Sequence, residues 1–550
     1  MFYLPRQNQI PMHRFFCAIL SLCLSGPCLY AQAPHIEKSE AFDEPDNGYN
    51  KVLLMKNGNT FFFHFQRKEG IEINVYNKER KLAFTQEISS DMWDTRKMNR
   101  IIVAGLYEIN NEAVLFVVET EGRVPTLYRM RFNGTTGAKI KEEEIGSTSK
   151  SKAFAFVQET NSIFIEKDPE SDCYAVILFN GYSKDPDDRI KVIHFDGNHN
   201  KLTTGLYDSP DDNFKYLRFI SAVVDGDKRV FISTYGAESL RGKEGRVFIS
   251  SLKAGDKGFV NKALEFTEDF KDTKSLMAYN RGTNSLQMLT MSFTTASIGF
   301  FGGGTSAKYL SFMSYIDPES LDLKSVKPVT GQKIMEYSRN TLKSPLDYKG
   351  LPQNMIINKD NSTTILSEEL TYKIVRTTTK NGTYTQEWTY MGGIATNELN
   401  ADGSEKSGYW IKKMQKADGI YPPLYISART KGRWTSLSTG NNSYFSYDYI
   451  NTDNNRYIIF NDNDQNFDKE EDEKKRKVVV KVKKLNTICY SLNGTGINKS
   501  FLFGEAGDGE GNSLHIDASD FDKSSNTYAT IMIEKDGRDR SAKMVWIKFN

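Results

Sequence analysis

The chain has 550 residues, of which 39% are apolar and 12% aromatic, with 40 Gly, 15 Pro and 5 Cys. This composition excludes a disordered chain, a collagen-like repeat and a small disulfide framework. The net charge of +2, from 72 basic and 70 acidic residues, also excludes a strongly basic nucleic-acid binder. A globular protein of one large repeat domain or several ordinary domains remains.

Residues 1–31 have the organisation of a secretory signal peptide. A basic leader precedes the apolar run 15–24, which has the length of a signal-peptide core and is too short to span a bilayer. We expect cleavage after Ala31. The alternatives are a buried N-terminal helix and a lipid anchor, although neither Cys23 nor Cys28 follows a small residue. The sequence therefore predicts an exported chain, periplasmic, surface-attached or released, without a transmembrane segment.

Removal of this leader changes the charge and the cysteine content. The mature chain loses two Arg and keeps 70 basic against 70 acidic residues. Only Cys173 and Cys489 remain. They could pair in an oxidising compartment, but two unpaired cysteines in strands are the simpler expectation.

The rest of the chain is a succession of β-hairpins, rich in Val, Ile, Phe, Tyr and Thr, with Asn, Asp and Gly at the turns. The first hairpin of each unit is expected at 52–65, 103–119, 153–181, 219–234, 276–292, 355–369, 447–462 and 514–534. The second hairpin follows at 73–88, 128–145, 191–207, 247–266, 310–329, 394–414 and 488–503, and the last unit has only 544–550.

Two consecutive hairpins make a four-stranded antiparallel sheet, the blade of a β-propeller. The expected third strands align at Tyr76, Phe132, Phe195, Leu252, Ile316, Leu399, Leu492 and Phe549. We therefore predict an all-β protein in which residues 32–550 form a single β-propeller of about eight blades, with seven as the alternative. Separate β-sandwich domains are disfavoured, because no long Pro- or Ser-rich linker divides the units.

The last predicted unit lacks its fourth strand. The segment 34–42 of the mature N-terminus resembles the other fourth strands in length and polarity. We expect the two chain ends to pair and thereby close the ring, which would remove two exposed sheet edges.

Long connections are predicted on one face of the propeller. In a four-stranded meander, the loops between strands two and three emerge on the same side as the loops between blades. The long inserted loops are expected around 330–351, 370–390, 415–440 and 461–477, with others at 234–246 and 293–308. Variable loops on a rigid scaffold are where binding usually resides.

Three tryptophans lie in or beside these loops. Trp93, Trp388 and Trp434 are predicted as ligand-binding residues, because exposed tryptophan is enriched at binding surfaces. The alternative is that each one caps the end of a blade.

One segment has the ligand spacing of a calcium loop. The predicted metal ligands are Asp462, Asp464, Asn466, Asp468 and Glu473, with Glu470 as a further acid. Oxygen atoms at alternate positions suit a hard cation, but Phe467 stands where such a loop needs Gly. The competing interpretation is a solvated helix, since 470–477 holds four acid-before-base pairs at i,i+4 spacing. Calcium is the one cofactor that the sequence suggests.

Catalytic motifs are weak or absent. The Gly-rich segment 299–306 lacks the Lys of a phosphate-binding loop, and no HExxH, GxSxG or sialidase box occurs. No catalytic residue is predicted.

Three stretches resemble a known group of proteins. A hairpin at 354–369, a strand pair at 392–416 and a strand end at 455–467 follow one another in the order seen in exported bacterial β-propeller-like proteins of unassigned function. Residues 414–416 depart from the Pro-Lys-x-Gln ending of that pattern. The resemblance implies the propeller fold and export, and it brings no catalytic residues.

Two functions follow as hypotheses. The first is an exported, non-catalytic β-propeller that binds an envelope protein or a surface glycan through its long-loop face. The second is a calcium-assisted hydrolase or lyase with its site at the central opening, which predicts converging carboxylates near the axis. A purely structural envelope component is a third possibility.

Overall fold

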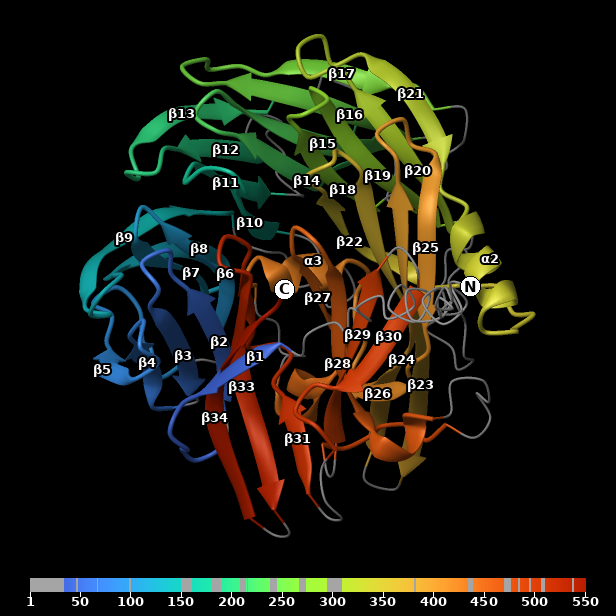
Figure 1. Cartoon of the computed structure of the whole chain (residues 1–550). Helices are drawn as coiled ribbons and strands as arrows, with labels where there is room; N and C mark the ends of the chain where they lie inside the picture. Colours follow the sequence, from blue (N-terminus) through green and yellow to red (C-terminus); the bar gives the residue numbers. More distant parts are fainter. Residues whose placement is uncertain are drawn as a thin grey trace, which may run out of the picture.

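The computed structural model contains eight antiparallel β-sheets that follow one another along the chain (Figure 1). It describes residues 34–45, 48–66, 68–97, 100–149, 161–180, 189–207, 214, 216–237, 245–266, 274–293, 309–379, 382–433, 439–468, 476–482, 485–493, 496–505, 510–536 and 539–550. The predicted β-propeller of eight four-stranded blades is confirmed, and the alternative of separate sandwiches is wrong, because consecutive strands fill one sheet before the next begins.

Sheets 1 to 4 are simple four-stranded meanders. Sheet 1 contains β2 (Gly48–Leu54), β3 (Thr60–Gln66), β4 (Gly70–Tyr76) and β5 (Leu82–Ile88). Sheet 2 contains β6 (Ile101–Ile109), β7 (Glu112–Glu121), β8 (Val124–Asn133) and β9 (Lys139–Ser147). Sheet 3 contains β10 (Asn161–Lys167), β11 (Tyr174–Asn180), β12 (Ile190–Phe195) and β13 (Lys201–Leu206). Sheet 4 contains β14 (Tyr216–Asp225), β15 (Arg229–Ala237), β16 (Gly245–Lys253) and β17 (Val260–Leu264).

Sheets 5 and 7 are also four-stranded, whereas sheets 6 and 8 each contain a fifth strand. Sheet 5 contains β18 (Lys274–Asn280), β19 (Ser285–Phe293), β20 (Tyr309–Ile316) and β21 (Leu323–Pro328). Sheet 6 contains β22 (Leu351–Ile357), β23 (Thr363–Thr379), β24 (Gly382–Leu399), β25 (Glu405–Ile411) and β26 (Gln415–Asp418). Sheet 7 contains β27 (Asp448–Asn451), β28 (Arg456–Asn463), β29 (Leu485–Asn493) and β30 (Gly496–Phe501). Sheet 8 contains β31 (Gly511–Leu514), β32 (Asp520–Asp522), β33 (Thr527–Asp536), β34 (Asp539–Lys548) and β1 (His35–Lys38).

Hairpin turns explain why the periodic pattern could be followed in the sequence. At the β2–β3 turn, Gly58 has φ +89°, a left-handed conformation that glycine adopts without strain. The backbone N–H of Met55 donates to the carbonyl of Asn59 across this turn, at 2.9 Å. The residues that mark the predicted third strands lie in or directly after the observed third strands of all eight sheets.

The core lies between neighbouring sheets. Phe61 and Phe63 of sheet 1 pack in one buried cluster with Leu115 and Phe132 of sheet 2, and the rings of Phe63 and Phe132 are 5.9 Å apart. Burial of such side chains contributes roughly 2–3 kcal/mol each, so the stacking of sheets is the main source of stability.

The chain ends pair as predicted. β1 forms an antiparallel ladder with β34, in which His35 lies opposite Lys548. The same sheet packs against sheet 1: Trp546 is buried among side chains of both sheets, and its indole N–H donates to Thr60 Oγ1 at 2.8 Å. The last sheet therefore contacts the first.

Two of the long connections contain helices. The 330–351 connection holds α2 (Gln332–Asn340), which packs on β25. The 415–440 connection holds β26 and α3 (Tyr425–Thr430), and the 3-10 helix η3 (Gly440–Tyr444) follows.

The prediction of a loop at 370–390 is wrong, because residues 370–379 and 382–390 are the paired outer parts of β23 and β24. The 461–477 connection begins with the 3-10 helix η4 (Asp464–Asn466). Most of 234–246 and 293–308 lies outside the described residues.

The two remaining cysteines are unpaired. Cys173 lies beside β11 and Cys489 lies in β29, and both are buried. The predicted signal peptide, residues 1–31, lies outside the described part of the chain. Among the described residues, no helix is long and apolar enough to cross a membrane.

Candidate functional site

The β23–β24 hairpin extends far beyond β22 and β25, the strands that flank it in sheet 6. β22 pairs with β23 only as far as Glu368, and β25 pairs with β24 only from Ile394. Beyond these points β23 and β24 form ten further residue pairs, from Leu370 opposite Met391 to Thr379 opposite Gly382. Figure 1 shows the two long strands continuing past β26. We call these ten pairs the extension.

A bulge marks the start of the extension. Glu369 has no partner in the ladder, and its carboxylate accepts a hydrogen bond from the backbone N–H of Gly393 at 2.9 Å. A Cβ atom on Gly393 would lie 2.1 Å from Nε1 of Trp410, so glycine is needed for this close approach. β-Bulges bend a strand pair and re-aim its side chains.

One face of the extension carries a row of aromatic side chains. Tyr384, Trp388 and Tyr390 are separated by even numbers of residues on β24, so they share a face of the strand. Tyr384 is 50% exposed, and Trp388 and Tyr390 are partly exposed.

Two lysines lie on the same face. Lys373 of β23 is directly opposite Trp388, and Lys416 of β26 is directly opposite Tyr390. The Lys416 ammonium lies 4.0 Å from the centroid of Trp388 and 5.9 Å from that of Tyr390, which are cation–π distances. We call the set of Tyr384, Trp388, Tyr390, Lys373 and Lys416 the aromatic face.

The segment 476–482 continues this surface beside β26. Val479 bridges Gln415 in parallel orientation, donating its N–H to the Met414 carbonyl at 2.9 Å and accepting from the Lys416 N–H at 2.8 Å. Val478 and Val480 flank this bridge and are 38% and 46% exposed. By strand alternation they lie on the side of Lys416.

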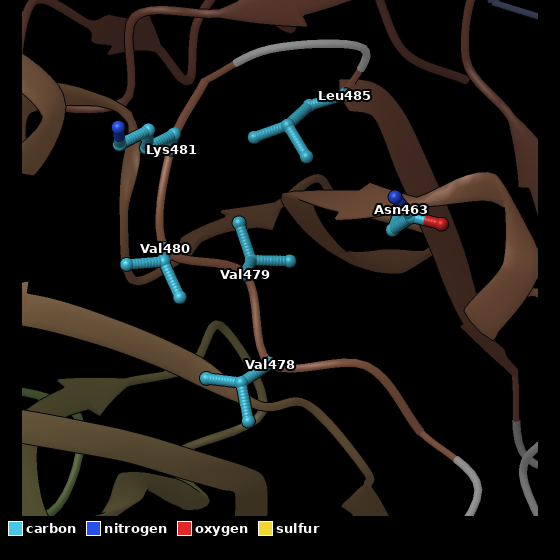
Figure 2. A pocket seen from close by; sticks show the side chains of 6 residues that line it. All are labelled: Asn463, Val478, Val479, Val480, Lys481 and Leu485. Atoms are coloured by element: carbon cyan, nitrogen blue, oxygen red, sulfur yellow. The ribbon is translucent and has the colours of Figure 1, made fainter.

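A cavity of about 310 Å³ is lined by residues 478–481 of this segment together with Asn463 of β28 and Leu485 of β29. In Figure 2, Val479 points toward Leu485 and Asn463, whereas Val478 and Val480 point away. Val478 and Val480 are therefore exposed, whereas Val479 between them is buried.

The opposite face of the extension anchors it to the propeller. The Tyr372 hydroxyl donates to the Tyr421 carbonyl at 2.9 Å, and Thr389 is fully buried, with its hydroxyl donating to the Gly419 carbonyl. Further out, Arg376 and Glu387 of this face are exposed. The base of the extension is therefore fixed, and its outer part is in solvent.

The second notable region is the centre of the propeller, which α3 occupies. Figure 1 shows α3 near the middle of the molecule, beside β22 and β27. The Lys431 ammonium, just after α3, pairs with Glu166 of β10 at 2.6 Å. A Cβ on Gly432 would lie 2.7 Å from the backbone N of Leu106 in β6. The first strands of several sheets thus contact this segment.

Buried charges hold α3 in place. Arg429 pairs with Asp448 of β27 at 2.6 Å and faces Asp517 at 3.6 Å, and Lys51 of β2 donates to the Asp517 carbonyl at 2.7 Å. Ser519 and the buried Tyr528 also donate to the Asp448 carboxylate, at 2.6 and 2.7 Å. We call Lys51, Arg429, Asp448 and Asp517 the axial cluster.

Burial dominates the titration of the axial cluster and its neighbours. It lowers the pKa of Lys51 to about 8, although Asp517 opposes this shift. It raises the pKa of the adjacent Asp520 to about 6 and lowers the pKa of His515 to about 3. Perturbed pKa values can indicate catalysis, but each acid of the axial cluster is already held by a partner.

A small cavity of about 130 Å³ lies between α3 and the first strands of sheets 2 to 5. Phe164 and Phe219 line it, with ring centroids 4.6 Å apart, and Lys431 closes one part of it. Its volume is comparable with that of a cavity holding one small aromatic ring.

A second buried ion pair links β23 to the connection between β25 and β26. Lys413 and Glu368 are both fully buried, with 2.5 Å between Nζ and Oε1. Tyr425 and Ser446 donate to the second carboxylate oxygen, and Gln415 accepts from Lys413 at 3.0 Å. Burial lowers the pKa of Lys413.

The three tryptophans predicted to bind ligand differ in their surroundings. Trp93 is 6% exposed and packs in the core between sheets 1 and 2, which agrees with the alternative that it caps a sheet. Trp388 is partly exposed on the aromatic face. Trp434 lies outside the described residues.

The predicted calcium ligands make internal contacts. Asp462 is buried and pairs with Arg476 at 2.9 Å, while Asn466 donates to Asp462 and accepts from the Lys477 N–H. Asp464 accepts from Asn486 at 2.6 Å.

Asp468 is exposed, and Glu473 lies outside the described residues. Among described residues, no group of three or more His, Cys, Asp or Glu side chains is placed to hold a metal ion.

Comparison with known proteins adds little. No protein-family model and no curated protein matches the sequence. Among solved structures, the chain is similar to the polysaccharide lyase Uly1, with a TM-score of 0.38 and 11% identity over 82% of this chain and 90% of the other. It is also similar to a protein from Lactobacillus plantarum, with a TM-score of 0.35 and 11% identity over 79% of this chain and 91% of the other. At this level, neither structure bears on what this chain binds or catalyses.

Sequence reasoning named Trp388 but missed Tyr384, Tyr390 and Lys416. The signal was available: the three aromatic residues of 384–390 stand at even spacing, which is the period of a strand. Because residues 370–390 were expected to form a loop, this strand-like spacing was not interpreted as a shared face.

Proposed function

We propose that this protein is an exported, non-catalytic β-propeller that binds an envelope protein or a surface glycan through its long-loop face. The observation that carries the proposal is the aromatic face, which stands on a strand pair extending ten residue pairs beyond β22 and β25. Aromatic side chains give large contact areas at a low cost in conformational entropy and are enriched at binding surfaces.

The exposure of these residues supports binding rather than packing. A solvent-exposed Tyr or Trp forgoes the stabilisation that burial brings, roughly 2 kcal/mol for a large apolar side chain. Among the described residues, most large aromatic side chains are buried, Trp546 and Tyr447 among them. Ligand binding gives the exposed row a role that packing does not.

The test is capture of binding partners by the mature chain from the envelope fraction of its source. Tyr384→Ala/Trp388→Ala should abolish capture. Arg376→Ala/Glu387→Ala, on the opposite face of the same extension, is the matched control and should retain it. Capture that is equal for both double variants would contradict the proposal.

The calcium-assisted hydrolase or lyase has less support. The Asp448 carboxylate pairs with Arg429, the Asp517 carboxylate faces the same guanidinium at 3.6 Å, and α3 occupies the centre where that site was expected. Calcium-dependent cleavage of a polysaccharide by the purified protein, lost on Asp448→Asn, would favour this function instead.

Export is part of the proposal and has its own test. Expression of the full chain in a bacterial host should yield a product that begins at Gln32, found outside the cytoplasm. A product that retains residues 1–31 in the cytoplasm would contradict it.

A further inference from the structure

We infer that the aromatic face binds an acidic polysaccharide chain lying along β24. This inference rests on the proposed function and narrows its ligand to one chemical class. It follows from three properties of the face: its linear shape, its stacking surfaces and its uncompensated positive charge.

The shape of the face suits a chain rather than a broad surface. Tyr384, Trp388 and Tyr390 stand on one strand, so the row spans about 20 Å at about 3.3 Å per residue. Only β23 flanks it along the outer half. A stable protein–protein interface buries roughly 800 Å² on each partner, which a two-stranded ribbon with a single aromatic row does not readily supply.

The side chains suit sugar rings. The axial C–H groups of a pyranose present an apolar face that packs on the negative face of an aromatic ring, while its hydroxyls remain in water. Spaced rings along a strand can engage successive sugars of one chain. Tyr384, at 50% exposure, presents its ring and hydroxyl together.

The charge suits an acidic ligand. The Lys416 ammonium lies over Trp388, and Lys373 is opposite Trp388 on β23. Among the described residues, neither lysine has an ion-pair partner, whereas Lys413 and Lys431 are paired with Glu368 and Glu166.

One acid shares the face. Asp418 of β26 is opposite Trp388 in the middle of the row and is exposed, whereas Lys416 is opposite Tyr390 at the inner end. We therefore expect ligand carboxylates to lie beside Lys373 on the β23 side of Trp388, or beside Lys416 at the inner end of the row. A carboxylate beside Asp418 would meet like charge.

The inference is tested by affinity electrophoresis of the mature chain in gels that contain polygalacturonate or alginate, with dextran and pullulan as neutral probes. We expect retardation by an acidic polysaccharide, weakened as salt rises. Tyr384→Ala and Lys373→Ala/Lys416→Ala should each lower affinity on the order of tenfold. Arg376→Ala/Glu387→Ala should leave it within about twofold.

Each other outcome identifies what has failed. Equal retardation by neutral polysaccharides, unaffected by the lysine substitutions, would overturn the acidic ligand but leave glycan binding. No retardation by any polysaccharide, with capture of an envelope protein that Tyr384→Ala abolishes, would overturn the inference and leave the proposed function. If the mature chain unfolds cooperatively on heating, and so is folded, but binds no polysaccharide and captures no envelope protein, both the inference and the proposed function are overturned.

Discussion

The axial cluster and the aromatic face use charged and aromatic residues in opposite ways. In the axial cluster, buried Arg429 pairs with Asp448 and faces Asp517, and buried Lys51 donates to the Asp517 carbonyl. On the aromatic face, the Lys416 ammonium lies over Trp388 with no ion-pair partner among the described residues, and half of Tyr384 is exposed to solvent. Satisfied buried charges fix an arrangement of elements, whereas exposed unpaired groups are available to a ligand. The two regions should therefore respond differently to substitution.

The largest difference should appear at the buried pair of Glu368 and Lys413. Glu368→Ala leaves an uncompensated buried ammonium, so we expect a loss of about 3–5 kcal/mol in the free energy of unfolding. Glu387→Ala, an exposed glutamate on the extension, should change it by less than about 0.5 kcal/mol. Chemical denaturation of both variants measures the two changes in unfolding free energy. Equal losses in Glu368→Ala and Glu387→Ala would contradict the prediction.

The double variant Glu368→Met/Lys413→Met sharpens the same measurement. Replacing both ions by apolar side chains should cost much less than Glu368→Ala, because no charge is left unpaired. A double variant as unstable as Glu368→Ala would show that the pair acts through its hydrogen bonds to Tyr425 and Ser446 instead.

A smaller effect is expected from pH. The pKa of Lys51 is about 8 in the folded chain against 10.5 in the unfolded one, so above pH 8 the unfolded state binds more protons. Stability should therefore rise with pH in this window, by about 1.5 kcal/mol between about pH 8 and pH 9.5. Lys51→Met should remove the rise, and exposed Lys78→Met should keep it. If the free energy of unfolding varies identically with pH in wild type and Lys51→Met, the attribution of the rise to Lys51 is wrong.

A still smaller effect on stability is expected at the outer end of the aromatic face. Tyr384→Ala removes a half-exposed side chain, so the free energy of unfolding should change by less than about 0.5 kcal/mol while ligand capture is lost. Thermal unfolding and capture measured on one preparation separate the two quantities. A large destabilisation would mean that the extension is a structural element.

The smallest effect is expected from calcium. Asp462 is already paired with Arg476, and burial raises the pKa of its carboxyl. We expect the same melting temperature in calcium and in chelator. A rise with calcium that Asp468→Ala abolishes would restore the calcium-loop hypothesis, since ligands that bind only the folded state stabilise it.

The fold was predictable because its determinants are local. Two-residue periodicity and turn residues such as Gly58 recur in every unit, and the positions from Tyr76 to Phe549 mark the third strands. Pairing of the chain ends followed from counting strands.

The site was only partly predictable, because its determinants are relations between distant segments. The extension is exposed on both faces at its outer end, so it lacks the apolar alternation that identifies a half-buried strand. Lys416 meets Trp388 only because β26 returns to β24. The residues around Trp93 and Trp388 do not show which tryptophan is buried. The difference in exposure arises from packing against segments distant in sequence.

The ladder between β1 and β34 also constrains how the chain folds. Ile36 lies opposite Ile547, so β1 cannot complete its sheet until β34, more than 500 residues later in the chain, has been synthesised. Contacts this remote in sequence form slowly, because a long loop must close before they contribute. Sheets 1 to 7 can assemble from consecutive strands in the meantime, leaving the flank of sheet 1 that meets Trp546 uncovered. The eighth sheet is therefore expected to form late, and a chain that lacks it would expose apolar surface and unpaired strand edges that favour aggregation.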